Sequence, residues 1–245
     1  MIRLRRPAEA EVLDERSRNY LAKLQKAAHA YPAASAEIDR AWAKFLRTKA
    51  RKQVAQALDA WTFAKCAYCE QIAAKDIEHF YPKTSHPGRM FQWTNFLRGC
   101  KNCNNAKLDR FPLQDDKPLL IDPCDEEPLD FFLWDYLSGR MALYPDGPNH
   151  TRATATRDLF DLDQEPLREE RRQKLQDILY LLAKVVEEGP LSEKTCERLR
   201  EHLQPHRPWL GIIRQLFRKP NTYAALVEAA LAKLPEIQEW TKEWL

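Results

Sequence analysis

The chain has 245 residues, a net charge of +3 and 44% hydrophobic residues, an ordinary composition for a globular protein of one or two domains. No run approaches the roughly 18 consecutive apolar residues of a membrane-spanning helix, and no apolar stretch follows the basic opening MIRLRRPAEAEVL, as it would in a secretory signal. These features argue against a membrane-spanning or exported protein, and we expect a cytoplasmic location.

The first 61 residues predict a helical region. The spacing of apolar residues predicts an amphipathic helix over 8–27, which the proline of AHAYPAAS ends. Ser35 can cap a second helix that extends to about Trp61. Four basic side chains would share one face of that second helix: Arg40, Lys44, Arg47 and Arg51. This face either follows a phosphate backbone or is only solvated.

The next region, 62–125, contains two C-x-x-C pairs separated by 30 residues. This arrangement predicts a structural zinc ion held by four thiolates. Three disulfides would suit a secreted protein and a single C-x-x-C could be a redox dithiol, but two such pairs without an export signal favour zinc. We interpret Cys124 and Cys196 as small core or surface residues. The predicted zinc ligands are Cys66, Cys69, Cys100 and Cys103.

Within the region 62–125, a short helix is expected to begin near Cys100. The region 126–165 contains two strand-like runs around a Ser-Gly turn, FFLWDYLSGRMALYP, which predict a β-hairpin. The region 166–245 predicts helices at 166–188, 191–203, 206–218, 221–233 and 235–244, separated by Gly189-Pro190, Pro205, Pro220 and Pro235. The sequence therefore predicts an α+β fold, mainly α, with a zinc-stabilised core between N-terminal and C-terminal helical regions.

The stretches IEHFYPK and WTNFLRGCKNCNNAK resemble the HNH nuclease family, which has the ββα-metal fold. The resemblance implies that Glu78 is the metal-binding acid and His79 the general base. It implies that Asn95 holds the loop and the base in place, that Asn104 is the last metal ligand, and that Lys107 ends the motif. Asn104 stands where many members of the family have histidine, so the chain would be an H-N-N variant.

The residue types suit hydrolysis of a phosphodiester bond. Neutral imidazole can take a proton from water near pH 7, and a hard cation such as Mg²⁺ or Mn²⁺ prefers oxygen ligands of the kind that Glu78 and Asn104 offer. Adjacent residues of a regular strand point to opposite faces, so Glu78 and His79 need a strand end or a bulge to reach one phosphate. Five basic residues are candidates for contact with nucleic acid: Lys83, Arg98, Lys101, Lys107 and Arg110.

A wider resemblance includes the opening IRLRRPAEAEVL and the stretches LLIDPCDEEP, LSGRMAL and LFDLDQEPLREERR. Together they resemble the HNH nuclease subunit of Septu-type anti-phage systems, which also occurs with some retrons. This resemblance implies an ATPase partner of the ABC/SMC type and a nucleic-acid target. We expect DNA, with two alternatives: an RNA-directed nuclease, for instance one that cuts tRNA, and a non-catalytic zinc module that binds nucleic acid or protein.

Overall fold

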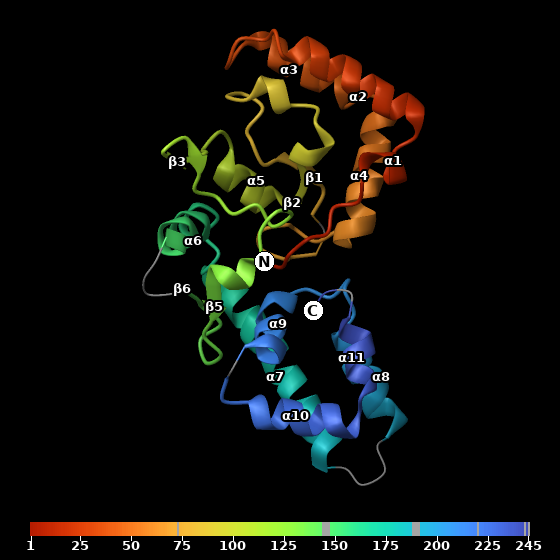
Figure 1. Cartoon of the computed structure of the whole chain (residues 1–245), viewed down its shortest axis with the longest axis vertical. Helices are drawn as coiled ribbons and strands as arrows, with labels where there is room; N and C mark the ends of the chain where they lie inside the picture. The colour runs from red at the N-terminus through yellow and green to blue at the C-terminus, as the bar shows by residue number, and fades with distance from the viewer. Residues whose placement is uncertain (73, 144–147, 188–191, 220, 243, 245) are drawn as a thin grey trace. The chain divides into compact units, whose positions relative to one another are not determined.

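The structure, a computed structural model, describes residues 1–72, 74–143, 148–187, 192–219, 221–242 and 244. It is α+β and mainly helical with small two-stranded sheets, which confirms the predicted class (Figure 1). The chain divides into two compact units. One unit is Leu4–Glu126, and the other combines Met1–Arg3 with Glu127–Leu245. The predicted division into four regions stays a prediction. Gly189, Pro190 and Pro220 lie outside the described residues. Within the described ranges, no helix combines the length and apolar character needed to cross a lipid bilayer.

Four helices open the first unit: α1 (Glu9–Val12), α2 (Glu15–Ala28), α3 (Ala36–Phe45) and α4 (Lys49–Thr62). The prediction of two uninterrupted helices was wrong, because each contains an internal cap. The side chain of Asp14 accepts a hydrogen bond from the Ser17 amide at 2.7 Å, and that of Thr48 accepts one from the Arg51 amide at 3.1 Å. The predicted basic stripe is therefore divided: Arg40 and Lys44 lie in α3, Arg51 lies in α4, and Arg47 lies in the turn between them.

The core of this unit lies between these helices and a small sheet. Figure 1 shows α2 and α4 close together, and they pack against each other while α4 also contacts the sheet. Burial of these large apolar side chains, at about 25 cal/mol per Å² of apolar surface, is the main stabilising contribution. The central residues are Leu21, Phe45, Val54, Leu58, Phe91 and Phe96.

The sheet consists of β1 (Asp76–His79) and β2 (Phe96–Gly99), which are antiparallel and pair in unbroken register from Asp76 with Gly99 to His79 with Phe96. Helix α5 (Lys101–Lys107) follows β2 directly, as predicted, and the strands are connected through the 3₁₀ turns η1 (Pro87–Arg89) and η2 (Trp93–Asn95). A second hairpin joins β3 (Leu113–Gln114) to β4 (Lys117–Pro118).

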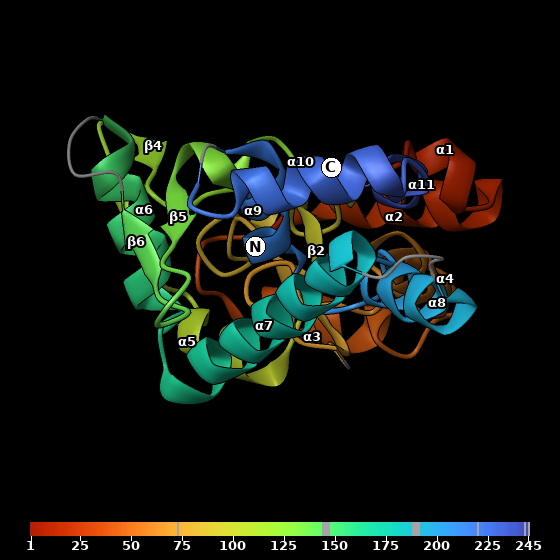
Figure 2. The same cartoon turned by 90° about the horizontal axis from the view of Figure 1, so that it is seen from below.

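The second unit contains the predicted hairpin and the predicted C-terminal helices. The Ser-Gly turn requires glycine, since Gly139 has φ +68° and a Cβ there would lie 2.2 Å from the Arg168 carbonyl oxygen. Figure 2 shows the long helix α7, against which α8 and α10 pack. The elements are η3 (Pro128–Asp130), β5 (Phe132–Trp134), β6 (Met141–Leu143), α6 (Pro148–Leu159), α7 (Glu165–Glu187), α8 (Glu193–His202), α9 (Leu210–Arg218), α10 (Ala224–Lys233) and α11 (Glu236–Thr241).

Candidate metal centre and active site

The four predicted zinc ligands converge. Cys66 and Cys69 lie in the loop after α4, Cys100 caps the N-terminus of α5, and Cys103 lies in the first turn of that helix. Their sulfur atoms all lie within 4.8 Å of one another, and the Sγ atoms of Cys69 and Cys100 are 3.7 Å apart. The Cys103 amide donates to Cys100 Sγ at 3.4 Å, a bond that stabilises a thiolate. Four buried sulfur donors at this spacing fit a tetrahedral zinc ion.

Hydrogen bonds among the four thiols shift their pKa values in opposite directions: they lower the pKa of Cys100 and raise those of Cys69 and Cys103. Hydrogen bonds from the neighbouring thiols, first among them Cys103, hold the pKa of Cys100 far below the usual range of a thiol. A thiolate is the form that binds zinc, so Cys100 is the ligand most readily available in that form. Binding of zinc would release the protons of the other thiols. The backbone also connects the two pairs, because the Ala67 amide donates to the carbonyl oxygen of Arg98 in β2 at 2.8 Å. Zinc in this position would join the loop after α4 to the start of α5.

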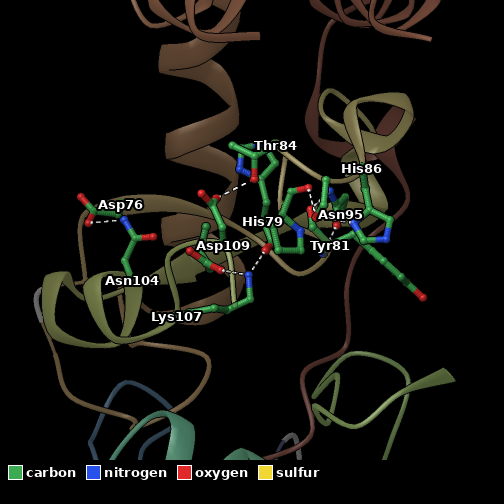
Figure 3. A network of polar contacts seen from close by, with 12 residues as sticks. Asp76, His79, Tyr81, Thr84, His86, Asn95, Asn104, Lys107 and Asp109 are labelled. Carbon is green, nitrogen blue, oxygen red and sulfur yellow. Dashed lines mark hydrogen bonds and ion pairs between the residues drawn. The ribbon is translucent and has the colours of Figure 1, made fainter. Parts of the chain in front are cut away.

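The two faces of β1 carry different groups. On the face toward α5, Glu78 Oε1 lies 2.6 Å from the ammonium nitrogen of Lys107, which also donates to the His79 carbonyl oxygen. Asn104 Nδ2 donates to Asp76 Oδ2 at 2.9 Å (Figure 3). The acid and the amide predicted as metal ligands thus lie on the same side of the sheet, and the carboxylate of Asp76 lies there with them. The i, i+2 spacing of Asp76 and Glu78 in a strand was the sequence signal for this third group.

Gly99 makes room for these side chains. A Cβ at this position would lie 3.0 Å from Glu78 Cβ, so a larger residue would crowd Glu78, whereas the 3.9 Å to Asn104 Cβ is an ordinary contact. The carboxylates of Asp76 and Glu78 and the amide oxygen of Asn104 are the hard donors that Mg²⁺ and Mn²⁺ prefer, and this donor set fits such an ion. Burial raises the pKa of Glu78, while the charge of Lys107 opposes that rise.

His79 lies at the end of β1 on the opposite face from Glu78. Its ring packs edge-on against Trp42 of α3 and against Phe96, with ring centroids 4.7 and 5.4 Å away. His79 Nε2 is 2.9 Å from the Met90 carbonyl oxygen. A proton on Nε2 satisfies that carbonyl and leaves Nδ1 as the basic atom. Burial lowers the pKa of His79 to about 3, so the ring is neutral near pH 7.

Asn95 holds the loop that follows His79. Its Oδ1 accepts a hydrogen bond from the Tyr81 amide at 2.7 Å, and its Nδ2 donates to the carbonyl oxygens of Tyr81 and Arg89, both at 3.0 Å. Asn95 itself is buried, and a buried amide that spans two backbone segments fixes both. This geometry suits the loop-holding role that the resemblance implies.

The basic candidates divide into two groups. Arg98 is buried and pairs with the two carboxylate oxygens of Asp59 at 2.6 and 2.7 Å. Lys107 is also buried and pairs with Glu78, so internal pairing argues against direct phosphate contact for these two. Lys101 and Arg110 are exposed, and Lys83 is half-buried, 3.5 Å from Asp39. These three remain candidates for contact with nucleic acid.

Replacing Lys107 with methionine is expected to lower the free energy of unfolding by about 3–5 kcal/mol, because Glu78 would be left buried without its partner. Urea unfolding measures this change. Lys101→Met makes the same substitution at an exposed site of the same helix and should change stability by less than about 0.5 kcal/mol. The double variant Glu78→Gln/Lys107→Met should recover part of the loss. Equal stability of the two single lysine variants contradicts the buried ion pair.

Comparison with known proteins gives a short match. A stretch of 48 residues is 40% identical to "Septu protein PtuB" of Bacillus thuringiensis and covers 18% of this chain and 19% of that protein. The chain therefore matches about a fifth of the length of this curated relative. No family model matches the chain.

Proposed function

We propose that this protein is a metal-dependent endonuclease of the HNH type that hydrolyses phosphodiester bonds of nucleic acid, with DNA as the expected target. We further propose that it is the effector of a Septu-type anti-phage defence system and acts with an ATPase partner. The arrangement around β1 carries the proposal: oxygen donors on the face toward α5, and a neutral histidine at the strand end. The short similarity to Septu protein PtuB supports the biological setting.

Each group has a chemical task in this proposal. Asp76, Glu78 and Asn104 would hold Mg²⁺ or Mn²⁺, which supplies positive charge for the scissile phosphate and the leaving 3′-oxygen. His79 Nδ1 takes a proton from the attacking water, while the Met90 carbonyl fixes the orientation of the ring through Nε2. Lys107 balances the charge of Glu78.

Burial of His79 sets a further requirement for its proposed role as general base, because the bound substrate must raise its pKa. A base with a pKa of about 3 accepts a proton poorly, and a neighbouring anion raises the pKa of an imidazole. The phosphate of a bound substrate would be such an anion. Trp42, which packs on the ring and is itself half-buried, would have to leave Nδ1 accessible to water in the complex.

Incubation of the purified protein with plasmid DNA, single-stranded DNA and tRNA, each with and without Mg²⁺, tests the proposal. We expect cleavage that requires Mg²⁺ and is strongest on DNA. Cleavage of tRNA but not of DNA would correct the substrate to RNA.

Asn104→Ala is expected to reduce cleavage to near the background rate, because it removes an oxygen donor of the candidate ion site. Asn104→His should retain some activity and shift the preferred ion toward Mn²⁺, Ni²⁺ or Zn²⁺, which imidazole suits better than an amide does. Initial rates across a series of divalent ions measure both effects. Asn105→Ala, at the exposed neighbouring position, should cleave like the wild type. Full activity of Asn104→Ala assigns the ion to other residues.

A zinc module without catalytic activity is the second candidate function. The observation that favours it is that Glu78 is already neutralised by Lys107 and His79 is enclosed by aromatic rings. Such a module would bind nucleic acid or a protein without any dependence on Mg²⁺. Binding without cleavage of any substrate in the incubation above would select this function.

A further inference from the structure

Aromatic side chains gather in the loop that leaves the candidate active site. The ring of Tyr81 lies 5.3 Å from His86 and 5.0 Å from Phe111, and His86 and Phe111 are 5.4 Å apart. The ring of Phe80, which is buried, packs edge-on against those of Tyr81 and Phe111, with centroids 5.2 and 5.4 Å away. Tyr81, His86 and Phe111 are each half-buried, so these three residues keep some exposure to solvent.

Arg89 completes the group. Its guanidinium carbon lies 3.9 Å from the centroid of the Tyr81 ring, while the side chain as a whole is exposed. Among the described residues, no carboxylate pairs with Arg89, so its charge remains available. Burial first, and then the charge of Arg89, lower the pKa of His86, so its ring is neutral near pH 7 and can act as an aromatic surface.

Hydrogen bonds hold the loop that carries these rings close after His79. Asn95 binds the amide and the carbonyl of Tyr81, two residues after the candidate base (Figure 3). Asn95 also binds the Arg89 carbonyl. Thr84 Oγ1 donates to Asp109 Oδ1 at 2.6 Å, which joins the loop to the segment that carries Phe111. A cluster that only filled a core would be enclosed, whereas Tyr81, His86 and Phe111 are half-buried and Arg89 is exposed.

We propose that Tyr81, His86, Phe111 and Arg89 form a stacking platform for an unpaired nucleobase. Bases stack on aromatic rings and on guanidinium planes, and only bases outside a double helix offer a free face for this. The substrate of the proposed nuclease would therefore be single-stranded, or have an unpaired nucleotide beside the cut. The location of the platform relative to the reaction rests on the proposed function, but its binding of bases does not.

Fluorescence of 2-aminopurine in a short oligonucleotide tests the platform, without added Mg²⁺ so that cleavage plays no part. Stacking quenches this base, and we expect the wild-type protein to bind and quench the single strand much more strongly than the same sequence in a duplex. Tyr81→Leu and Arg89→Gln should bind about 5- to 150-fold more weakly, the range for loss of one stacked base, and should lose quenching. Tyr81→Trp should retain it.

Tyr180→Leu is the matched control, because Tyr180 is an exposed tyrosine of α7 with the ammonium of Lys184 5.8 Å from its ring centroid. It should bind like the wild type. Zinc content and thermal unfolding check that each variant is folded, and Arg89→Gln alters only an exposed side chain. Equal binding and quenching by wild type, Tyr81→Leu and Arg89→Gln overturns the platform. So does equal quenching of single strand and duplex by the wild type.

The two proposals can fail separately. Mg²⁺-dependent cleavage of duplex DNA without quenching of single strands retains the nuclease and removes the platform. Quenching that depends on Tyr81, without cleavage of any substrate, retains the platform on a binding protein.

Discussion

Removal of zinc is expected to unfold the unit Leu4–Glu126 while much of the helical signal of the second unit remains. Zinc bound by the four cysteines would join the loop after α4 to the start of α5. Between these points lie β1 and β2, each of four residues, and a two-stranded sheet this short is not stable alone. Structural zinc contributes on the order of 10–16 kcal/mol of binding free energy, which is comparable to the total stability of a domain.

Circular dichroism during titration with a zinc chelator measures this effect, together with elemental analysis of the purified protein. We expect roughly one zinc ion per chain. Cys66→Ser and Cys100→Ser should reproduce the loss of structure, whereas Cys196→Ser, in α8 and far along the chain from the cluster, should melt like the wild type. A well-folded protein without bound metal contradicts the zinc centre.

Replacement of His79 is the second change with a large expected effect. His79→Gln removes the candidate proton acceptor but keeps a side chain of similar size against Trp42 and Phe96. The loss of a general base typically lowers the rate about 10²- to 10⁴-fold. His79→Ala should lower the rate as much and also lower the melting temperature, because it leaves a cavity in a buried site.

Single-turnover cleavage rates separate these contributions from substrate binding. His206→Gln, the same substitution at an exposed histidine beside Glu201, should leave the rate unchanged. Cleavage by His79→Gln at the wild-type rate would remove His79 from the chemistry and leave its packing as its role.

The sequence was informative where local spacing decides the structure. The paired C-x-x-C motifs predicted the sulfur cluster, the turn at Gly139 predicted the hairpin, and the prolines and apolar spacing predicted most of the C-terminal helices. Each of these depends on residues that are close in sequence or on a ligand geometry with few solutions. The division of the N-terminal helices was missed because the caps at Asp14 and Thr48 outweigh a continuous apolar pattern.

The candidate site was less predictable because its partners are distant in sequence. Lys107 and Arg98 are charged residues of a polar segment, and only the tertiary fold brings Glu78 and Asp59 to them. The enclosure of His79 depends on Trp42, from a helix whose packing cannot be derived from the HNH-like motif. The hydrogen bond between Asn104 and Asp76 also depends on the pairing register of β1 with β2, which the sequence alone does not specify.

The most direct test of the proposed chemistry is analysis of the ends that remain after cleavage. Attack of water on the phosphorus with departure of the 3′-oxygen leaves a 5′-phosphate and a 3′-hydroxyl, on DNA and on RNA alike. We expect these ends from the wild-type protein with Mg²⁺ and no product when Mg²⁺ is withheld. A 2′,3′-cyclic phosphate on RNA, cleavage that persists without Mg²⁺, or the absence of products from every substrate would contradict a metal-dependent hydrolase at this site.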